Sequence, residues 1–253
     1  MSLLQLHEVT KRFGGLIAVN EVSLALEEGD IMGLIGPNGA GKSTVFNLIT
    51  GNYTPEGGDI FFEGRSIKGL KPNSVVSMGI ARTFQTIRLF QGLPVLENVL
   101  AGRHCRMKSG LLSCLFHTPG QRREEKAAIK RAMAELEFVG IADMYDWEAG
   151  SLSYGNQRLL EIARAMATDP RLIILDEPAG SMNDPETDTL TRIIRAIRDR
   201  GVTVLLIEHD MKLVMRVCEK LVVLEYGGVI ASGTPEAVRR DPKVIEAYLG
   251  QEK

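Results

Sequence analysis

The chain has 253 residues, of which 44% are hydrophobic and 25% charged, and its formal net charge is -2. This is the composition of a globular protein with a substantial core, and the near-neutral charge argues against a nucleic-acid partner. The N-terminus lacks a secretory signal pattern, and no apolar run reaches the roughly 18 to 20 residues needed to cross a bilayer. Three scattered cysteines, Cys105, Cys114 and Cys218, form no CxxC pair and indicate a reducing compartment.

The first part of the chain reads as strands. LLQLHEV and VNEVSLALEEGD alternate apolar and polar positions, which predicts two antiparallel strands joined by a turn at FGG. DIMGLI is almost wholly apolar, as a buried parallel strand should be, and KSTVFNLIT after it predicts a helix. Residues 171–176 and 202–208 have the same buried character. The helical pattern of residues 184–201 between them implies a right-handed crossover and a parallel sheet.

The middle of the chain, from about residue 95 to 167, has helical periodicity and no strand signal. The segment 121–140 is expected to place four apolar residues on one helix face and charges on the other. These four are Ile129, Ala132, Met133 and Leu136. Residues 106–120 read as a loop of unclear role. We therefore predict one α/β domain over residues 1–253, with a helical subdomain of about residues 95–167 inserted in its core.

A glycine-rich stretch, GLIGPNGAGKST, lies between the predicted buried strand and its helix. It has the full GxxxxGK[ST] spacing, in which glycines permit a turn tight enough to aim backbone N–H groups at phosphates. Lys42 is expected to reach the β- and γ-phosphates, and the Ser43 hydroxyl to coordinate Mg²⁺. The predicted nucleotide contacts are Gly36, Asn38, Gly39, Ala40, Gly41, Lys42, Ser43 and Thr44.

Two adjacent carboxylates end the predicted strand at residues 171–176. Consecutive strand residues point to opposite sides, so Asp176 and Glu177 are expected to differ in role. We predict that Asp176 holds Mg²⁺ and that Glu177 polarises the attacking water as the general base. Without a cation between them and the phosphates, two carboxylates at a buried strand end would be costly.

Two further polar residues are candidates for the same site. His209 follows the strand at residues 202–208, at the edge where parallel sheets collect ligand groups, and we interpret it as a γ-phosphate contact. Gln85 can donate and accept hydrogen bonds, which suits holding a water or completing the metal shell. A lone structural histidine and a surface glutamine are the alternatives. The predicted catalytic set is Glu177, His209 and Gln85, and the predicted metal set is Ser43, Gln85 and Asp176.

A second stretch, SLSYGNQR at residues 151–158, opens a predicted helix. The first N–H groups of a helix have no internal partners, so such an opening suits an anion. An ordinary cap, in which Ser153 accepts a backbone hydrogen bond, is the other interpretation, and both can hold. The residues alone leave open why a chain with one strong phosphate loop would carry a second phosphate-seeking turn.

The motifs GPNGAGKST, Gln85, LSYGNQR, LIILDEP and His209, in this order, resemble the ATP-binding subunits of ATP-binding-cassette (ABC) transporters. This implies a P-loop α/β fold with a mostly parallel sheet, an N-terminal antiparallel β-subdomain and an inserted helical subdomain. It also implies that Ser153, Gly155 and Gln157 cap the γ-phosphate held by a second ATPase subunit. Phe13 resembles the aromatic that stacks on adenine, with a core aromatic as the equal alternative. Residues 180–184 depart from the family's subunit-facing D-loop pattern.

Longer stretches are similar to the ATP-binding subunits of bacterial branched-chain amino-acid importers: GGLIAVNEVSL, GIARTFQTIRLFQGLPVLENVLAGRH and HTPGQRREE. The resemblance implies ATP and Mg²⁺ as cofactors and a place on the cytoplasmic face of the bacterial membrane. Its implied partners are a second ATPase subunit, transmembrane permeases and, indirectly, a periplasmic or extracellular binding protein. Urea or amide import, lipopolysaccharide export and a soluble non-transport ABC ATPase are the alternatives.

The segment from Gln85 to about Leu96 resembles the region that docks the permease. Its apolar side chains fit either a docking groove or the core of the helical subdomain, and a mixture of the two is expected. These side chains are Ile87, Leu89, Phe90 and Leu93.

Overall fold

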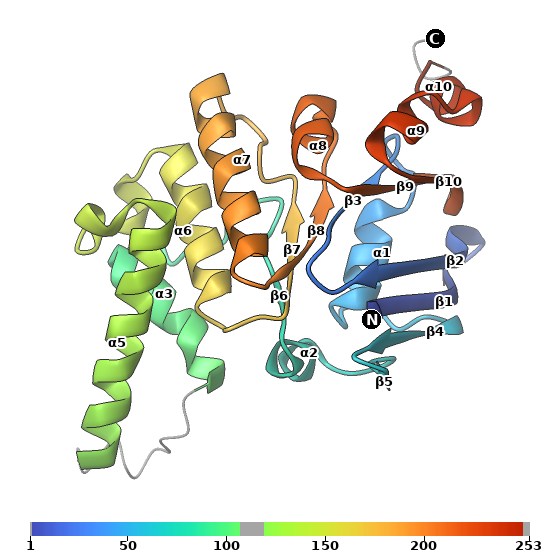
Figure 1. Ribbon diagram of the computed structural model, residues 1–253. Coiled ribbons are helices and arrows are strands. Elements are labelled where there is room, and N and C mark those ends of the chain that lie inside the picture. The colour runs from blue at the N-terminus through green and yellow to red at the C-terminus, as the bar shows by residue number, and fades with distance from the viewer. Residues whose placement is uncertain (1, 107–118, 250–253) are drawn as a thin grey trace.

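We describe a computed structural model of the chain over residues 2–106 and 119–249 (Figure 1). Its strands are β1 Ser2–Phe13, β2 Leu16–Glu27, β3 Ile31–Ile35, β4 Gly57–Phe62, β5 Arg65–Ser66, β6 Ile80–Arg82, β7 Leu172–Asp176, β8 Thr203–Ile207, β9 Lys220–Glu225 and β10 Gly228–Gly233. Its α-helices are α1 Lys42–Ile49, α2 Pro72–Met78, α3 Val95–Arg103, α5 Pro119–Val139, α6 Tyr154–Met166, α7 Asp184–Asp199, α8 Met211–Val217, α9 Pro235–Arg239 and α10 Pro242–Leu249. The 3₁₀ turns are His104–Arg106, Ala142–Met144 and Ala149–Ser151.

The central sheet has the strand order β10-β9-β3-β8-β7-β6. The neighbours from β9 to β6 run parallel, and β10 adds an antiparallel edge. Every residue of β3, β7 and β8 is buried. Along β7, Ile173 and Leu175 enter one hydrophobic cluster, whereas Leu172 and Ile174 enter a second cluster on the other face. Two covered faces explain why these strands are apolar at every position rather than at alternate ones.

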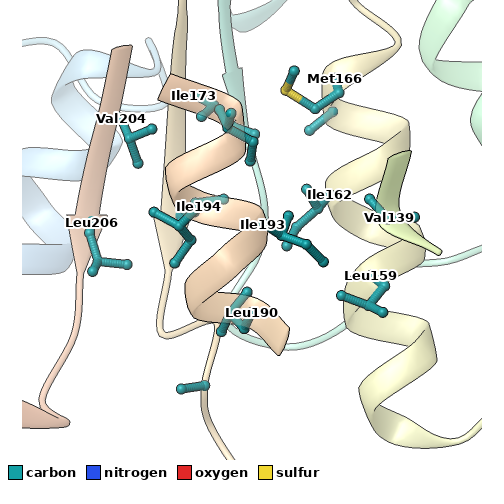
Figure 2. Close-up of a cluster of buried hydrophobic side chains, with 14 of the residues drawn as sticks. Val139, Leu159, Ile162, Met166, Ile173, Leu190, Ile193, Ile194, Val204 and Leu206 are labelled. Atoms are coloured by element: carbon teal, nitrogen blue, oxygen red, sulfur yellow. The ribbon is translucent and has the colours of Figure 1, made fainter. Parts of the chain in front are cut away.

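Helix α7 joins β7 to β8 and packs on the sheet, as the sequence predicts. Figure 2 shows Leu190, Ile193 and Ile194 of α7 between the sheet and α6. A capping box at its start, in which Asn183 and Glu186 bond each other's backbone N–H groups, fixes where α7 begins. The apolar stripe of α7 therefore connects the central sheet to the helices on that side.

A separate antiparallel sheet has the strand order β2-β1-β4-β5. Helix α1 packs with this sheet and with one face of the central sheet, so that Phe46 and Ile49 share a buried cluster with Leu4 and Leu34. The predicted β1–β2 hairpin is present. Strands β4, β5, β6, β9 and β10 were not predicted. The sequences of β4, β5, β6 and β10 are short or mixed, whereas β9, KLVVLE, has a buried apolar run like that of β7 and was missed. The predicted fold class is confirmed.

Helices α3, α5 and α6 gather at the opposite end of the molecule from the antiparallel sheet (Figure 1). The predicted inner face of α5 is wrong by one position. Ile129 is 38% exposed, and Ala128 is buried in its place. The charges of α5 are not all on its outer face either, because Glu135 is fully buried and pairs with Arg200 at 2.8 Å, beyond the end of α7.

The loop predicted at residues 106–120 lies mostly outside the described residues, as does Cys114. Cys105 is exposed and Cys218 is buried, and neither forms a disulfide in the described part of the chain. Within residues 2–106 and 119–249, none of the helices carries an apolar stretch sufficient to span a bilayer.

Candidate functional site

The loop between β3 and α1 has a backbone that only glycine tolerates at two positions. Gly36 and Gly41 have φ values of 146° and 101°, in the region that L side chains avoid. A Cβ on Gly36 would lie 2.1 Å from the Leu224 carbonyl oxygen, and one on Gly41 would lie 2.4 Å from the Ala18 carbonyl oxygen. The loop is thus held against both sheets, and Asn38 and Gly39 in the loop and Ser43 at the start of α1 are exposed.

Lys42, the first residue of α1, is buried under this loop. Its ammonium donates hydrogen bonds to the carbonyl oxygens of Gly36 at 2.6 Å and Pro37 at 2.9 Å. Burial lowers the pKa of Lys42, and the charges of Glu177 and Asp176 oppose this shift. The lysine is therefore a cation held near two carboxylates. Its N–H groups could donate to phosphate oxygens in place of the loop carbonyl oxygens.

The two carboxylates at the end of β7 occupy different environments. Asp176 is the last strand residue and only 8% exposed, and burial together with the Glu177 charge raises its pKa to about 6. Glu177 follows with a left-handed backbone, at φ 46°. The expected separation of the two side chains is present, but its cause is this backbone turn rather than the alternation of a strand. A left-handed glutamate stores strain of the kind found at functional sites.

Gln85 and His209 both approach Glu177. The Gln85 side-chain amide donates to Glu177 Oε2 at 2.9 Å. His209 Nδ1 lies 3.8 Å from Glu177 Oε1, and the histidine side chain is 63% exposed. The structure thus brings the three predicted catalytic side chains together from three segments that are distant in sequence.

Glu208 is a buried residue of this site that the sequence analysis missed. Its Oε1 accepts from the Ala179 N–H at 2.9 Å, and its Oε2 accepts from the His209 N–H at 2.8 Å and the Asp210 N–H at 3.2 Å. The carboxylate therefore ties the loop after β7 to the loop after β8. Its position next to His209, at the end of an apolar strand, was the available signal.

A cleft of about 480 Å³ lies between the phosphate loop and the antiparallel sheet. Phe13 lines it at 43% exposure and stacks edge-on against Tyr53 at 5.2 Å, so it is not a core aromatic. Four lining residues were not predicted: Leu16, Ile17, Ala18 and Tyr226. The predicted residues that line it are Phe13, Asn38, Gly39, Ala40, Gly41, Lys42, Ser43, Thr44, Gln85 and Glu177.

The serine-led turn at the start of α6 does not line this cleft. Ser153 is the N-cap of α6, and its hydroxyl accepts a hydrogen bond from the Asn156 N–H at 3.3 Å. The Gln157 side chain donates to the Leu152 carbonyl at 3.0 Å. Gly155 is buried against Glu186, whose Oε1 would lie 2.5 Å from a Cβ at that glycine. The predicted cap is present, and these residues lie apart from the phosphate loop of their own chain.

Arg158 links this turn to the Gln85 segment. Its guanidinium, 3% exposed, donates to the carbonyl oxygens of Phe84 and Gln85. It also pairs with Glu161 at 2.9 Å and donates to the Tyr154 hydroxyl at 3.0 Å. The start of α6 and the Gln85 backbone are therefore connected through one buried cation.

The donors of this site fit a magnesium nucleotide. Mg²⁺ prefers oxygen ligands, and Ser43, Gln85 and Asp176 offer a hydroxyl, an amide oxygen and a carboxylate. The raised pKa of Asp176 reflects a buried carboxylate that a cation would stabilise. A glycine loop that opens into a helix, beside carboxylates at the ends of parallel strands, defines a P-loop nucleoside triphosphatase.

Known proteins resemble this chain along its whole length. The family model described as ABC transporter matches residues 19–180, and that of the branched-chain amino acid ATP-binding cassette transporter matches residues 229–253. The chain is 48% identical to the branched-chain amino acid transport ATP-binding protein BraF of Pseudomonas aeruginosa and 47% identical to LivG of Escherichia coli K12. Each alignment covers 98% of both proteins.

Solved structures similar to this chain are also ATP-binding cassettes. The ADP conformation of MJ1267, an ATP-binding cassette of an ABC transporter, has a TM-score of 0.87 and 35% identity, covering 99% of this chain and 100% of that one. The dimeric cassette MJ0796 has a TM-score of 0.77 and 25% identity, covering 92% of this chain and 98% of that one. The chain belongs to the ABC transporter family and is one of its ATP-hydrolysing, ATP-binding subunits.

Proposed function

We propose that the chain hydrolyses ATP to power the import of branched-chain amino acids through a membrane permease. The observation that carries the chemistry is the carboxylate of Glu177, held between Gln85 and His209 at the edge of the phosphate-loop cleft. The substrate class rests on the 48% and 47% identity to BraF and LivG over 98% of each protein. Cargo selection belongs to the permease and binding protein, so this chain indicates it only through its relatives.

In this proposal each residue acts on the phosphates or on the attacking water. The loop from Gly36 to Thr44 cradles the phosphates, and Lys42 exchanges its bonds to loop carbonyls for bonds to the β- and γ-phosphates. Glu177 accepts a proton from the attacking water, while Gln85 orients the glutamate. His209 contacts the γ-phosphate. Ser43, Gln85 and Asp176 would hold Mg²⁺, which would supply charge stabilisation at the phosphates.

A second ATPase subunit completes the site. The turn of Ser153, Gly155 and Gln157 does not line its own cleft, and in this proposal the N-terminus of α6 serves the γ-phosphate bound by the partner chain. The known dimer of the MJ0796 cassette supports such a pairing. Shifting two subunits from mostly open to mostly closed takes about 5.5 kcal/mol. A few charge-assisted hydrogen bonds, at about 1.5–3 kcal/mol each, are sufficient.

A second hollow of about 900 Å³ between the sheet and the helices suits a permease segment. Leu89 and Phe90 line it; Leu89 packs partly into the core, whereas Phe90 is 54% exposed. Three guanidinium groups, from Arg82, Arg88 and Arg164, also line it. We propose that an apolar permease helix with a carboxylate docks here and that the chain lies on the cytoplasmic face of the membrane.

Two measurements test the function: ATP binding by variants of the chain, and ATP hydrolysis by a mixed dimer. Lys42→Ala removes the cation of the cradle, so ATP affinity measured by calorimetry should fall at least about tenfold. Lys126→Ala, an exposed position on α5, is the matched control. In a dimer with one Ser153→Arg subunit, the altered chain should still bind ATP while hydrolysis fails at its partner's cleft. Normal ATP affinity in Lys42→Ala, or failure at the altered chain's own cleft, would contradict the proposal.

The transport assignment has its own test. The subunit is reconstituted with its permease and partner ATPase in vesicles, and leucine, urea and lipopolysaccharide are compared as cargo. Leucine uptake that requires ATP and Glu177 is the expected result. Uptake of urea alone, or no dependence on Glu177, would overturn it.

A further inference from the structure

The turn between β9 and β10 has an unusual residue at its first position. Tyr226 and Gly227 form a two-residue hairpin connection, and both have positive φ values, 45° and 82°. Such turns favour Asn-Gly or Asp-Gly, because bulky side chains are strained in this backbone region. A tyrosine is therefore kept here at an energetic cost to the turn.

The same turn is fixed to the phosphate loop. The Gly227 N–H donates to the Ala40 carbonyl at 3.0 Å, and the Gly227 carbonyl accepts from the Asn20 N–H at 2.8 Å. Tyr226 on this anchored backbone lines the cleft beside the phosphate loop and is 84% exposed. An anchored turn thus presents a solvent-facing ring at the edge of the cleft.

The lining of the cleft divides by chemistry. The loop backbone, Lys42 and the hydroxyls at the start of α1 occupy the phosphate end. The remaining lining, apart from Gln85 and Glu177, is apolar or aromatic: Phe13, Leu16, Ile17, Ala18 and Tyr226. An uncharged, flat base is the part of a nucleotide that suits these side chains, because every base offers a π-face to an aromatic ring.

We infer that Tyr226 is a second aromatic contact for the nucleotide base, acting from the β9–β10 side of the cleft in addition to Phe13. This inference rests on the proposed ATP site. The ring offsets the strain of its backbone only when a base is bound, so it contributes to affinity rather than to folding. Its hydroxyl is not required for stacking.

The test is Tyr226→Asn, which removes the ring and suits the turn. Calorimetry on the full chain should show ATP affinity reduced roughly five- to tenfold, with the affinity for inorganic tripolyphosphate unchanged. The melting temperature should stay the same or rise, because asparagine tolerates positive φ. Tyr226→Phe should retain wild-type ATP affinity. Tyr145→Asn, an equally aromatic but distant exposed position, should change neither affinity.

Unchanged ATP affinity in Tyr226→Asn would overturn the inference. An equal loss for ATP and tripolyphosphate would also overturn it, because the turn would then act through Ala40 on the phosphate loop. Lys42→Ala, measured in parallel, separates this failure from failure of the ATP site itself. If Lys42→Ala binds both ligands normally, the proposed site is wrong, whereas a loss there with no change in Tyr226→Asn rejects only the base contact.

Discussion

Gln85 and Glu177 are 92 residues apart in sequence, yet the glutamine amide donates to the glutamate carboxylate across 2.9 Å. Gln85 follows the edge strand β6, and Glu177 follows β7, which pairs with it in parallel. The hydrogen bond therefore spans the gap between two neighbouring strand ends. Any movement of the Gln85 segment therefore changes the hydrogen bonding of the carboxylate proposed as the general base.

Glu177→Gln should retain ATP binding and lose turnover. The amide keeps the size of the side chain but cannot accept the proton of the attacking water, and such a loss typically lowers the rate about 10²–10⁴-fold. Nucleotide affinity and steady-state phosphate release are the two measurements, and a trapped ATP-bound dimer is the expected product. Glu137→Gln, exposed on α5, is the control. Turnover within a factor of two of the wild type would remove Glu177 from the catalytic role.

Arg158→Met should destabilise the protein strongly. The methionine retains much of the volume but leaves Glu161 buried, with Arg164 at 3.7 Å as its one cationic partner among the described residues. Removing one partner of a buried ion pair costs about 3–5 kcal/mol, and urea unfolding measures it.

The matched double variant Arg158→Met with Glu161→Gln removes both charges and should recover part of that loss. If it is no more stable than the single variant, the charge on Glu161 is not the cause. The carbonyl oxygens of Phe84 and Gln85, which also lose a donor, would then account for the whole effect.

The central sheet and the phosphate loop could be predicted because their signals are local. Buried parallel strands such as β7 are apolar throughout, and the Gly36 to Ser43 spacing is fixed by the turn that a phosphate requires. The inner face of α5 could not be placed to within one residue. Ile129 is more apolar than Ala128, and only the packing partners decide that Ala128 is the buried one.

Within the site, the residues missed by sequence reasoning act through tertiary contacts. Glu208 resembles any acidic residue after a strand until its bonds to the backbone of Ala179 and His209 are seen. Tyr226 lies far along the chain from Phe13, and only the β9–β10 turn brings it to the same cleft. No periodic pattern contains such long-range placements.

Gly155→Ala should disturb the start of α7 as well as α6. The added methyl would lie 2.5 Å from Glu186 Oε1, and moving that side chain breaks its capping-box bond to the Asn183 N–H. A lost cap costs about 0.5–2 kcal/mol, which urea unfolding resolves. The control repeats Gly155→Ala in a Glu186→Ala background. There the added methyl meets no carboxylate, and the change should be neutral or stabilising, since alanine favours helix. Additive effects in this double-mutant cycle would show that the two residues are not coupled.

Asp176→Asn should stabilise the nucleotide-free protein at neutral pH and not at acid pH. Burial and the Glu177 charge raise the pKa of Asp176 from 3.8 to about 6. Between these values the folded chain holds a proton that the unfolded chain has released. The free energy of unfolding of the wild type therefore falls as the pH rises through this interval, and the penalty is complete above about pH 6. The asparagine variant lacks this titration, so its advantage should grow from near zero at pH 4 to on the order of 1–3 kcal/mol at pH 8.

Urea unfolding in EDTA at several pH values measures that difference, with Asp146→Asn at an exposed position as the control. Adding ATP and Mg²⁺ should reverse the order of stabilities at pH 8, because a ligand stabilises only the folded chain that binds it and the wild type retains the carboxylate. A pH-independent difference would mean that Asp176 does not carry the raised pKa. If ATP and Mg²⁺ stabilise both proteins equally, the carboxylate does not hold the metal.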